Sequence, residues 1–378
     1  MPKRPILGVL VNPIAGMGGR VGLKGTDGPE APARARALGA EPLAGARAAL
    51  ALAALDAAAV DVVAAAGAMG ADACHAAGFV PAQVVPVTAT PTADDTRHVA
   101  AALREAGADL VLFAGGDGTA RDVASVLGET VPLLGVPAGV KMYSAVFATS
   151  PAVAGRLARD FLTRPAEARR TRPVEIMDID EAALRAGVPA AALFGYARAP
   201  APAATAGLQA PKLASGRDEE AELDALCRRV AAEMRAGVAY VVGPGTTMRR
   251  LMAAAGLAGT LVGVDVVLDG QVVATDAGEG AILAAIDGRP AHVIVGVLGG
   301  QGCLFGRGNQ PISARVLARL GPDEISVLAS EAKLASLGTR GLFVDTGDPA
   351  VDRRLAGHRR VRTGPARTAI VAVHAPAG

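Results

Sequence analysis

Short apolar runs alternate with longer amphipathic segments through the first part of the chain. The runs Ile6–Val11, Val60–Ala65, Gln83–Val87, Asp109–Ala114 and Val131–Val136 have the length of buried strands. The alanine-rich segments between them place apolar residues at helical spacing. Strands and helices that alternate in this way predict an α/β fold with a doubly wound parallel sheet.

A different pattern begins near residue 171. Shorter strand signals follow, at 174–180, 193–198, 238–242, 292–298, 324–328, 342–345 and 368–373. An amphipathic helix is predicted at 219–234, and Asp269-Gly270 between alternating apolar residues predicts a hairpin. We therefore predict an N-terminal nucleotide-binding domain over 1–165 and a β-rich domain over 166–378, whose last strand is a candidate to return to the first domain.

Composition narrows the class of function. The 378 residues are 51% hydrophobic, which allows a large core, and the net charge of +2 gives no electrostatic case for nucleic acid or an anionic membrane. Three cysteines without CxxC spacing argue against a disulfide framework or a zinc cluster. No signal-peptide pattern is present, and no apolar run reaches the ~18–20 residues that span a bilayer. We expect a cytoplasmic homo-oligomer that acts on small molecules, without nucleic-acid or membrane partners.

The stretch Phe113–Asp122 carries the strongest functional signal. A buried strand runs into Gly115, Gly116 and Gly118, Thr119 suits a helix N-cap, and helical spacing follows. Glycines allow the backbone to approach phosphate oxygens, and the free N–H groups at a helix start point at the anion. This stretch therefore predicts a phosphate cradle.

Asp117 lies inside this cradle, where a carboxylate would repel a phosphate ligand. Two functions suit a carboxylate there: it can hold Mg²⁺, or it can accept the proton of an attacking hydroxyl. The alternative is a simple turn, because Asp-Gly is common in turns. Asp117 is the candidate catalytic residue and the candidate metal ligand.

The first strand also ends in a glycine-rich loop, which begins at Asn12 and contains Gly16 and Lys24. The loop lacks the Walker A spacing, so a standard P-loop is excluded. The chain has only five lysines, and two of them, Lys24 and Lys141, fall in glycine-rich loops. Both are candidates to neutralise phosphate; the alternative is that they face solvent.

Later strand ends repeat this geometry. The strand at 131–136 opens into a loop with the further candidates Tyr143 and Ser144, and an apolar helix is predicted from Ala145. The strand at 238–242 leads into a corner that suits either a phosphate or a plain helix cap, with the candidates Gly243, Gly245, Thr246 and Thr247. Arg307 and Asn309 lie among glycines, as ligand-facing residues or as turn formers.

Residues 115–119 resemble the GGDGT signature that NAD kinases share with diacylglycerol and sphingoid lipid kinases, and Asp122 stands where the lipid-kinase motif carries Glu. The Asn-Pro-x-x-Gly start at Asn12 is similar to the first nucleotide-binding motif of that superfamily. The stretch GVPAGVKMYSAVFA resembles the acetoin-operon (AcoX-like) branch of the ATP-NAD kinase family. The resemblance implies an α/β domain, a β-rich domain and an active site in the cleft between them. It also implies transfer of the ATP γ-phosphate, with Mg²⁺, to the adenosine ribose 2′-hydroxyl of NAD to give NADP.

The chain departs from the NAD kinase pattern on the acceptor side. NAD kinases carry an Asn-Glu pair that holds the second substrate, whereas neither Asn12 nor Asn309 precedes Glu. The segment Gly243–Thr247 only partly matches the Thr-Pro-x-Gly-Ser-Thr segment of those enzymes. Three interpretations stay open: a NAD kinase, a kinase of another small hydroxylated metabolite, and a non-catalytic nucleotide-binding regulator. The sequence leaves open the acceptor, the metal, the oligomeric state and whether polyphosphate replaces ATP.

Overall fold

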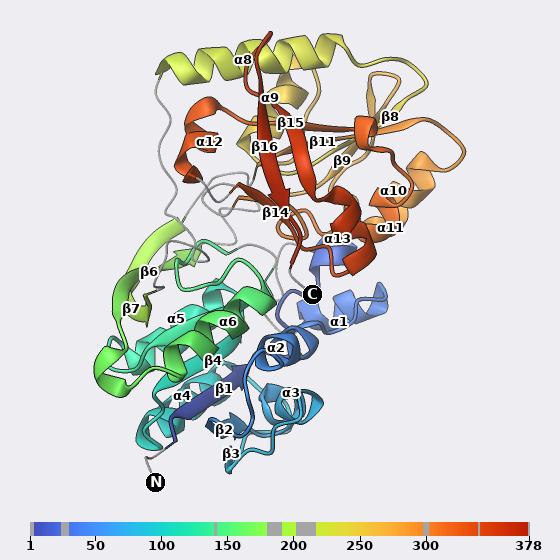
Figure 1. Cartoon of the computed structure of the whole chain (residues 1–378). Helices are drawn as coiled ribbons and strands as arrows, with labels where there is room; N and C mark the ends of the chain where they lie inside the picture. Colours follow the sequence, from blue (N-terminus) through green and yellow to red (C-terminus); the bar gives the residue numbers. More distant parts are fainter. Residues whose placement is uncertain are drawn as a thin grey trace. The chain divides into compact units, whose positions relative to one another are not determined.

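A computed structural model divides the chain into two compact units (Figure 1). The structure describes residues 4–23, 30–139, 142–179, 191–201, 217–297, 302–338 and 341–376. The first unit holds 4–17 and the described part of 41–201, and the second holds the described part of 18–40 and of everything from 217 onward. Among these residues, none of the helices combines the length and the hydrophobicity that a membrane crossing requires.

The first unit is built on a parallel sheet. Within the described ranges this sheet has five strands in the order β3-β2-β1-β4-β5, with every neighbouring pair parallel. The strands are β1 (Ile6–Val11), β2 (Asp61–Ala65), β3 (Gln83–Val85), β4 (Leu110–Gly115) and β5 (Leu133–Pro137). The order of the strands reverses between β1 and β4, and open α/β sheets bind ligands at such a switch point. The predicted doubly wound sheet is confirmed.

Both faces of this sheet are covered. One face packs against α2 (Ala44–Leu52), α3 (Ala71–Ala76) and α6 (Pro151–Leu162). The other face packs against α4 (Ala93–Glu105), α5 (Asp117–Leu127) and the antiparallel hairpin of β6 (Thr171–Ile179) and β7 (Ala191–Pro200). Short 3-10 turns lie at η2 (Gly67–Met69) and η3 (Ala166–Ala168). Because the strands are buried from both sides, their sequences are continuous apolar runs rather than alternating ones.

Two local predictions in the first unit are wrong. Helix α5 begins at Asp117 with Gly116 as its N-cap. Thr119, the predicted cap, lies inside the helix, and its hydroxyl accepts a hydrogen bond from Asn12. Residues 145–148 form a turn and a β-bridge to β5 rather than a helix, and their apolar side chains fill the core. Helix α6 begins only at Pro151, after Ser150 caps it by accepting the N–H of Val153.

The second unit is built on a mixed sheet. In the described part of the chain it has nine strands in the order β10-β9-β8-β11-β13-β15-β16-β14-β12. The run β8-β11-β13-β15 is parallel, and the pairs β8–β9, β9–β10 and β15–β16 are antiparallel. The strands are β8 (Ala239–Val242), β9 (Asp265–Leu268), β10 (Gln271–Ala274), β11 (Ala291–Gly296), β12 (Cys303–Phe305), β13 (Ile325–Leu328), β14 (Leu342–Val344), β15 (Gly357–Arg362) and β16 (Thr368–His374). The predicted β-rich C-terminal region is confirmed.

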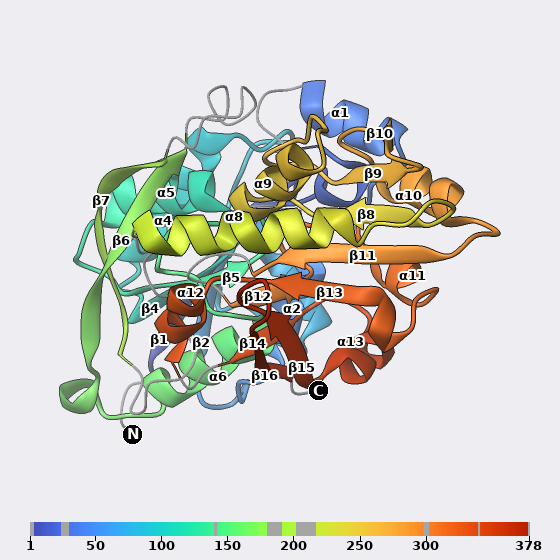
Figure 2. The ribbon, with the colours of Figure 1, turned by 90° about the horizontal axis from the view of Figure 1, so that it is seen from above.

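Helices also cover both faces of the second sheet. On one face lie α8 (Arg217–Ala232) and α9 (Thr246–Ala254), both seen in Figure 2. On the other face lie α10 (Glu279–Ile286), α11 (Ala314–Leu317), α12 (Glu331–Ser336) and α13 (Pro349–Leu355). The unit also contains α1 (Glu30–Ala37) and the 3-10 turns η1 (Gly19–Val21) and η4 (Pro322–Glu324).

The two units divide the chain at residues that differ from the predicted ranges 1–165 and 166–378. The hairpin β6–β7 packs with the first unit, although it follows residue 165. The η1 turn packs with the second unit, where Arg20 pairs with Glu279 at 3.3 Å. The last strand, β16, lies between β15 and β14 in the second sheet. Contacts between residues far apart in the sequence decide which unit each segment belongs to. The local sequence pattern does not show these contacts.

Candidate active site

Three strand ends of the first unit meet at one edge of its sheet. Because β1, β4 and β5 are parallel, the loops that follow them lie at the same, carboxyl edge. Asn12, directly after β1, donates from Nδ2 to the hydroxyl of Thr119 in α5, over 3.0 Å. This bond spans the switch point between β1 and β4. Two predicted site residues from separate motifs are therefore brought together.

Glycines allow these loops to pack against one another. Gly16 has φ +72°, and a Cβ added to it would lie 1.8 Å from the carbonyl oxygen of Ala138. A Cβ on Gly139 would lie 2.8 Å from the Cα of Gly116. Gly118 differs, because an added Cβ there would meet no described atom within 4 Å. The corner is thus tightly packed at Gly16, Gly116 and Gly139. It is open on the side to which a Gly118 side chain would point, in the first turn of α5.

The carboxylate of Asp117 is fixed by backbone donors. Its side chain is buried, and the residue is 5% exposed. Oδ2 accepts the N–H of Tyr143 at 2.6 Å, and Oδ1 accepts the N–H of Ser144 at 2.9 Å. A carboxylate oxygen can accept a proton or bind a hard cation such as Mg²⁺. Asp117 therefore has the chemistry of a base or of a hard-metal ligand.

Tyr143 and Ser144, both predicted as candidates, lie beside Asp117. The phenol of Tyr143 is partly exposed, and burial together with the negative charge of Asp117 raises its pKa. Ser144 is fully buried, and its hydroxyl accepts the N–H of Met177 in β6 at 2.9 Å. The Ser144 side chain is therefore used in a structural hydrogen bond to β6. The Tyr143 side chain lies close enough to Asp117 to be affected by its negative charge.

Asp122 lies further along α5 and forms an ion pair between helices. Its carboxylate contacts Arg97 of α4 at 2.8 Å and Arg121 at 3.6 Å. Burial raises the pKa of Asp122 and outweighs the two arginines, which lower it. The structure therefore places this candidate in the packing of α4 on α5. The sequence analysis did not single out Arg97, its main partner.

The candidates Lys24 and Lys141 lie outside the described residues. The prediction that these lysines neutralise phosphate stays a prediction.

The corner Gly243–Thr247 belongs to the second unit and follows β8. The N–H of Gly243 bonds to Ile294, and the N–H of Gly245, which has φ +118° and caps α9, bonds to Leu261. Thr246 is exposed, whereas Thr247 is buried and its carbonyl accepts the thiol of Cys227. The strand–glycine–helix geometry predicted here is confirmed.

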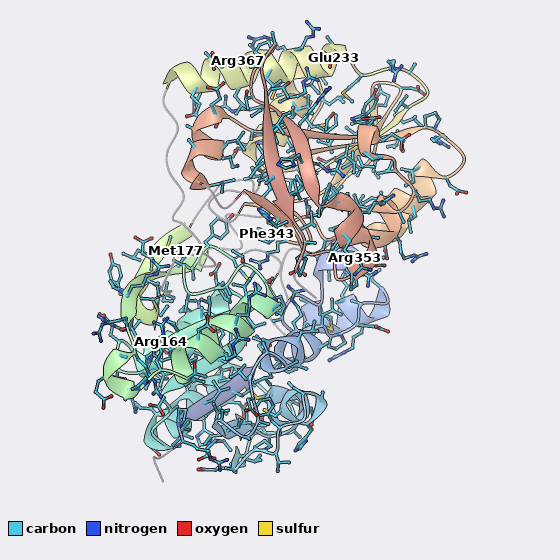
Figure 3. All side chains as sticks on the ribbon, in the orientation of Figure 1. Arg164, Met177, Glu233, Phe343, Arg353 and Arg367 are labelled. Carbon is cyan, nitrogen blue, oxygen red and sulfur yellow. The ribbon has the colours of Figure 1, made fainter. Side chains whose placement is uncertain are left out.

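Arg307 and Asn309 are buried in the second unit. Asn309 donates to the carbonyl of Leu304 at 2.8 Å and accepts the N–H of Gly306, so its amide closes the turn after β12. The guanidinium of Arg307 lies over the ring of Phe343, with 5.1 Å to the ring centroid; Phe343 is labelled in Figure 3. Of the two predicted alternatives, turn formation describes Asn309.

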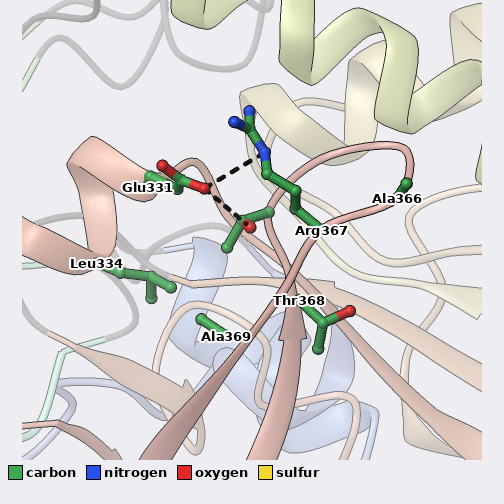
Figure 4. Close-up of a pocket in the computed structure, with 7 residues that line it drawn as sticks. Glu331, Leu334, Ala366, Arg367, Thr368 and Ala369 are labelled. Atoms are coloured by element: carbon green, nitrogen blue, oxygen red, sulfur yellow. Dashed lines mark hydrogen bonds and ion pairs between the residues drawn. The ribbon is translucent and has the colours of Figure 1, made fainter.

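A pocket of about 520 Å³ in the second unit was not predicted (Figure 4). Glu331, Thr363 and Arg367 give it a polar wall, where Glu331 contacts Arg367 at 3.4 Å and accepts from Thr363 at 3.5 Å. The sequence offered one signal, an arginine in the Gly-Pro-Ala-Arg turn between two strands. No group of three acidic, histidine or cysteine side chains suited to a metal occurs among the described residues.

Comparison with protein families matches most of the chain. The model for the ATP-NAD kinase N-terminal domain matches residues 7–166, and that for the ATP-NAD kinase C-terminal domain matches residues 235–373. The first range contains the loops around Asp117, and the second contains the corner Gly243–Thr247. No match was found among curated proteins or among solved structures.

Proposed function

Because the chain belongs to the ATP-NAD kinase family and is therefore a kinase that acts on a small molecule, we propose that its phosphoryl donor is ATP and its acceptor is NAD. The γ-phosphate passes to the 2′-hydroxyl of the adenosine ribose, and the product is NADP. The reaction replaces one phosphoanhydride bond by a phosphate ester and releases ADP and the hydroxyl proton.

The observation that carries this proposal is the fixed carboxylate of Asp117 at the switch point of a parallel sheet. Phosphoryl transfer needs little covalent chemistry from the protein and depends on positioning and on neutralised charge. Asp117 lies in the first turn of α5, where the N–H groups of the helix start favour an anion. The open space above Gly118 is where a phosphate can approach that helix start.

Asp117 also suits Mg²⁺, which prefers oxygen ligands and is usually held by one or two carboxylates together with substrate phosphates. In this proposal Asp117 either accepts the proton of the attacking hydroxyl or holds the metal ion. The metal ion would neutralise the charge of the phosphates. Gly115, Gly116, Gly118 and Thr119 form the phosphate cradle of the first unit.

A second candidate acceptor is another small hydroxylated metabolite. One observation favours it: Asn12 bonds to Thr119, and Asn309 bonds to Leu304, so both asparagines of the chain have structural partners. Neither is followed by Glu, as the Asn of the NAD-binding pair in the family would be. The donor side of the proposal does not depend on this choice.

The experiment is to incubate the purified protein with ATP, Mg²⁺ and NAD and to follow NADP with a coupled dehydrogenase. NADP formation supports the proposal. Consumption of ATP only when a panel of sugars, nucleosides and polyols replaces NAD would move the acceptor to the second candidate. Nucleotide binding without any ATP consumption would contradict a kinase and favour a regulator.

A further inference from the structure

The orientation of Asp117 depends on a segment outside any helix or strand. Two consecutive N–H groups, those of Tyr143 and Ser144, donate to its carboxylate at 2.6 and 2.9 Å. These residues lie 26 and 27 positions further along the chain, between β5 and α6. A shift of this segment would therefore move the carboxylate or leave it without two donors.

Strand β6 holds this segment in place on both sides of the Ser144 peptide. The Ser144 hydroxyl accepts the N–H of Met177 at 2.9 Å, and the N–H of Ala145 bonds to the carbonyl of Glu175 at 2.9 Å. Figure 3 labels Met177 on this strand. Ser144 is 0% exposed, so water does not compete for its hydroxyl. The segment beside Asp117 is thus bonded to β6 at two adjacent residues.

The same strand packs on the helix that carries Asp117. Val174 and Ile176 of β6 are buried in one core cluster with Ala120 and Val123 of α5. The structure therefore contains a closed chain of contacts, from Asp117 to the segment at 143–144, then to β6, and back to α5. Two bonds join the segment to β6: one is accepted by the buried hydroxyl of Ser144, and the other is donated by the backbone N–H of Ala145.

We propose that Ser144 is a positioning residue, which acts on the reaction through Asp117 without touching the substrate. The inference rests on the proposed phosphoryl transfer. A displacement of a catalytic group by about 1 Å can lower the rate about 100-fold. Removal of the Ser144 hydroxyl frees the segment from Met177 and changes the position of Asp117, while the glycine cradle is unaltered. The expected effect is a lower kcat with little change in the KM for ATP.

The test compares Ser144→Ala with the matched variant Ser150→Ala. Ser150 is also buried, at 4% exposed, and its hydroxyl also accepts one backbone N–H, that of Val153, at 3.2 Å. It caps α6 and has no bond to Asp117. We expect similar falls in Tm for the two variants. We expect kcat to fall about 100-fold in Ser144→Ala and less than about threefold in Ser150→Ala, with the KM for ATP within about threefold of the wild type in both.

Hydrogen exchange gives a readout that does not need activity. The amides at positions 143 and 144 should exchange about tenfold faster in Ser144→Ala than in the wild type or in Ser150→Ala, because local opening controls the exchange of bonded amides. Equal kcat values in the two variants, with an active wild type, would overturn the positioning role. An inactive wild type would instead contradict the proposed function. The exchange rates then test whether the Ser144 hydroxyl holds the segment at 143–144: faster exchange only in Ser144→Ala supports this, and equal exchange in both variants overturns it.

Discussion

The corners Gly115–Thr119 and Gly243–Thr247 have the same strand–glycine–helix pattern but different surroundings. In the first unit, glycines pack against neighbouring loops, and a buried carboxylate accepts two N–H groups from a distant segment. In the second unit, the corner has no acidic residue. A Cβ on its capping Gly245 would meet no described atom within 4 Å, although one on Gly243 would lie 3.0 Å from Val295. The shared pattern provides helix N–H groups in both places. The means to act on a hydroxyl proton or a metal is present only at the first corner.

In the proposed mechanism a glycine corner alone does not make a phosphoryl-transfer site. The proposed chemistry also needs a charged group, Asp117, which accepts hydrogen bonds from residues outside the motif. The following variants test the contrast between the two corners.

The largest effect is expected from Asp117→Asn. The amide cannot accept a proton as a carboxylate does and binds Mg²⁺ more weakly, so kcat should fall about 10²–10⁴-fold. Thr247→Ala in the second corner removes one hydroxyl. A single hydrogen bond is worth about 0.5–1.5 kcal/mol, so kcat should fall less than about tenfold. Steady-state kinetics of both purified variants checks the prediction. Equal losses would mean that the two corners contribute alike.

The next effect is on stability, through Gly16→Ala. The added methyl would meet the carbonyl of Ala138, so the loops must move apart. The control is Gly78→Ala in the same unit, where φ is +81° against +72° but nothing lies within 4 Å. Gly16→Ala should therefore cost about 1–3 kcal/mol more than Gly78→Ala in the free energy of unfolding. Denaturant unfolding measures both; equal costs would show that only backbone strain matters at Gly16.

A smaller effect is expected from Gly118→Ala, which should raise the stability of the fold and lower the activity. The residue is inside α5 with open space around it, so alanine should stabilise the fold by about 0.5–1 kcal/mol. The methyl then occupies the space proposed for phosphate, and kcat/KM for ATP should fall about tenfold, as when about 1.4 kcal/mol of binding is lost. Thermal unfolding and kinetics test the two parts. Unchanged kcat/KM would place the phosphate elsewhere.

The smallest effect concerns pH and the second unit. Burial lowers the pKa of His292, whose ring bonds to Ser326 at 2.8 Å. The folded state therefore binds a proton less readily than the unfolded chain, so the stability from neutral His292 is present above pH 6.5 and is lost as the pH falls through the lowered pKa. His292→Gln should remove this dependence, which amounts to a few degrees in Tm between pH 7 and 5. Tm is measured against pH for both proteins. The same dependence of Tm on pH in His292→Gln and in the wild type would contradict the assignment.

The sequence predicted the framework of the fold because that framework is local. Apolar runs of strand length and glycines at their ends identified the sheet of the first unit and the corners at 115–119 and 243–247. The hairpin at Asp269-Gly270 was predicted for the same reason, and both residues have positive φ.

What the sequence did not predict depends on partners far along the chain. Thr119 suits an N-cap by its residue type, but it lies inside α5. Its hydroxyl accepts a hydrogen bond from Asn12, more than 100 residues earlier in the chain. The apolar residues at 145–148 suit a helix, but they are bonded to β5 and β6 and are buried. The sequence identified Asp117 and named Tyr143 and Ser144 as candidates. It did not show that the backbone N–H groups of these two residues donate to the carboxylate, because a backbone group is not identified by residue type.

The most direct test of the central claim is a single turnover with enzyme in excess over NAD, at saturating ATP and Mg²⁺, for the wild type and Asp117→Asn. NADP is measured after rapid quenching, and ATP binding is measured separately by equilibrium dialysis. We predict that the wild type converts NAD to NADP and that Asp117→Asn binds ATP but forms NADP at least about 100-fold more slowly. Equal rates in the two proteins would contradict the assignment of the phosphoryl-transfer site to Asp117.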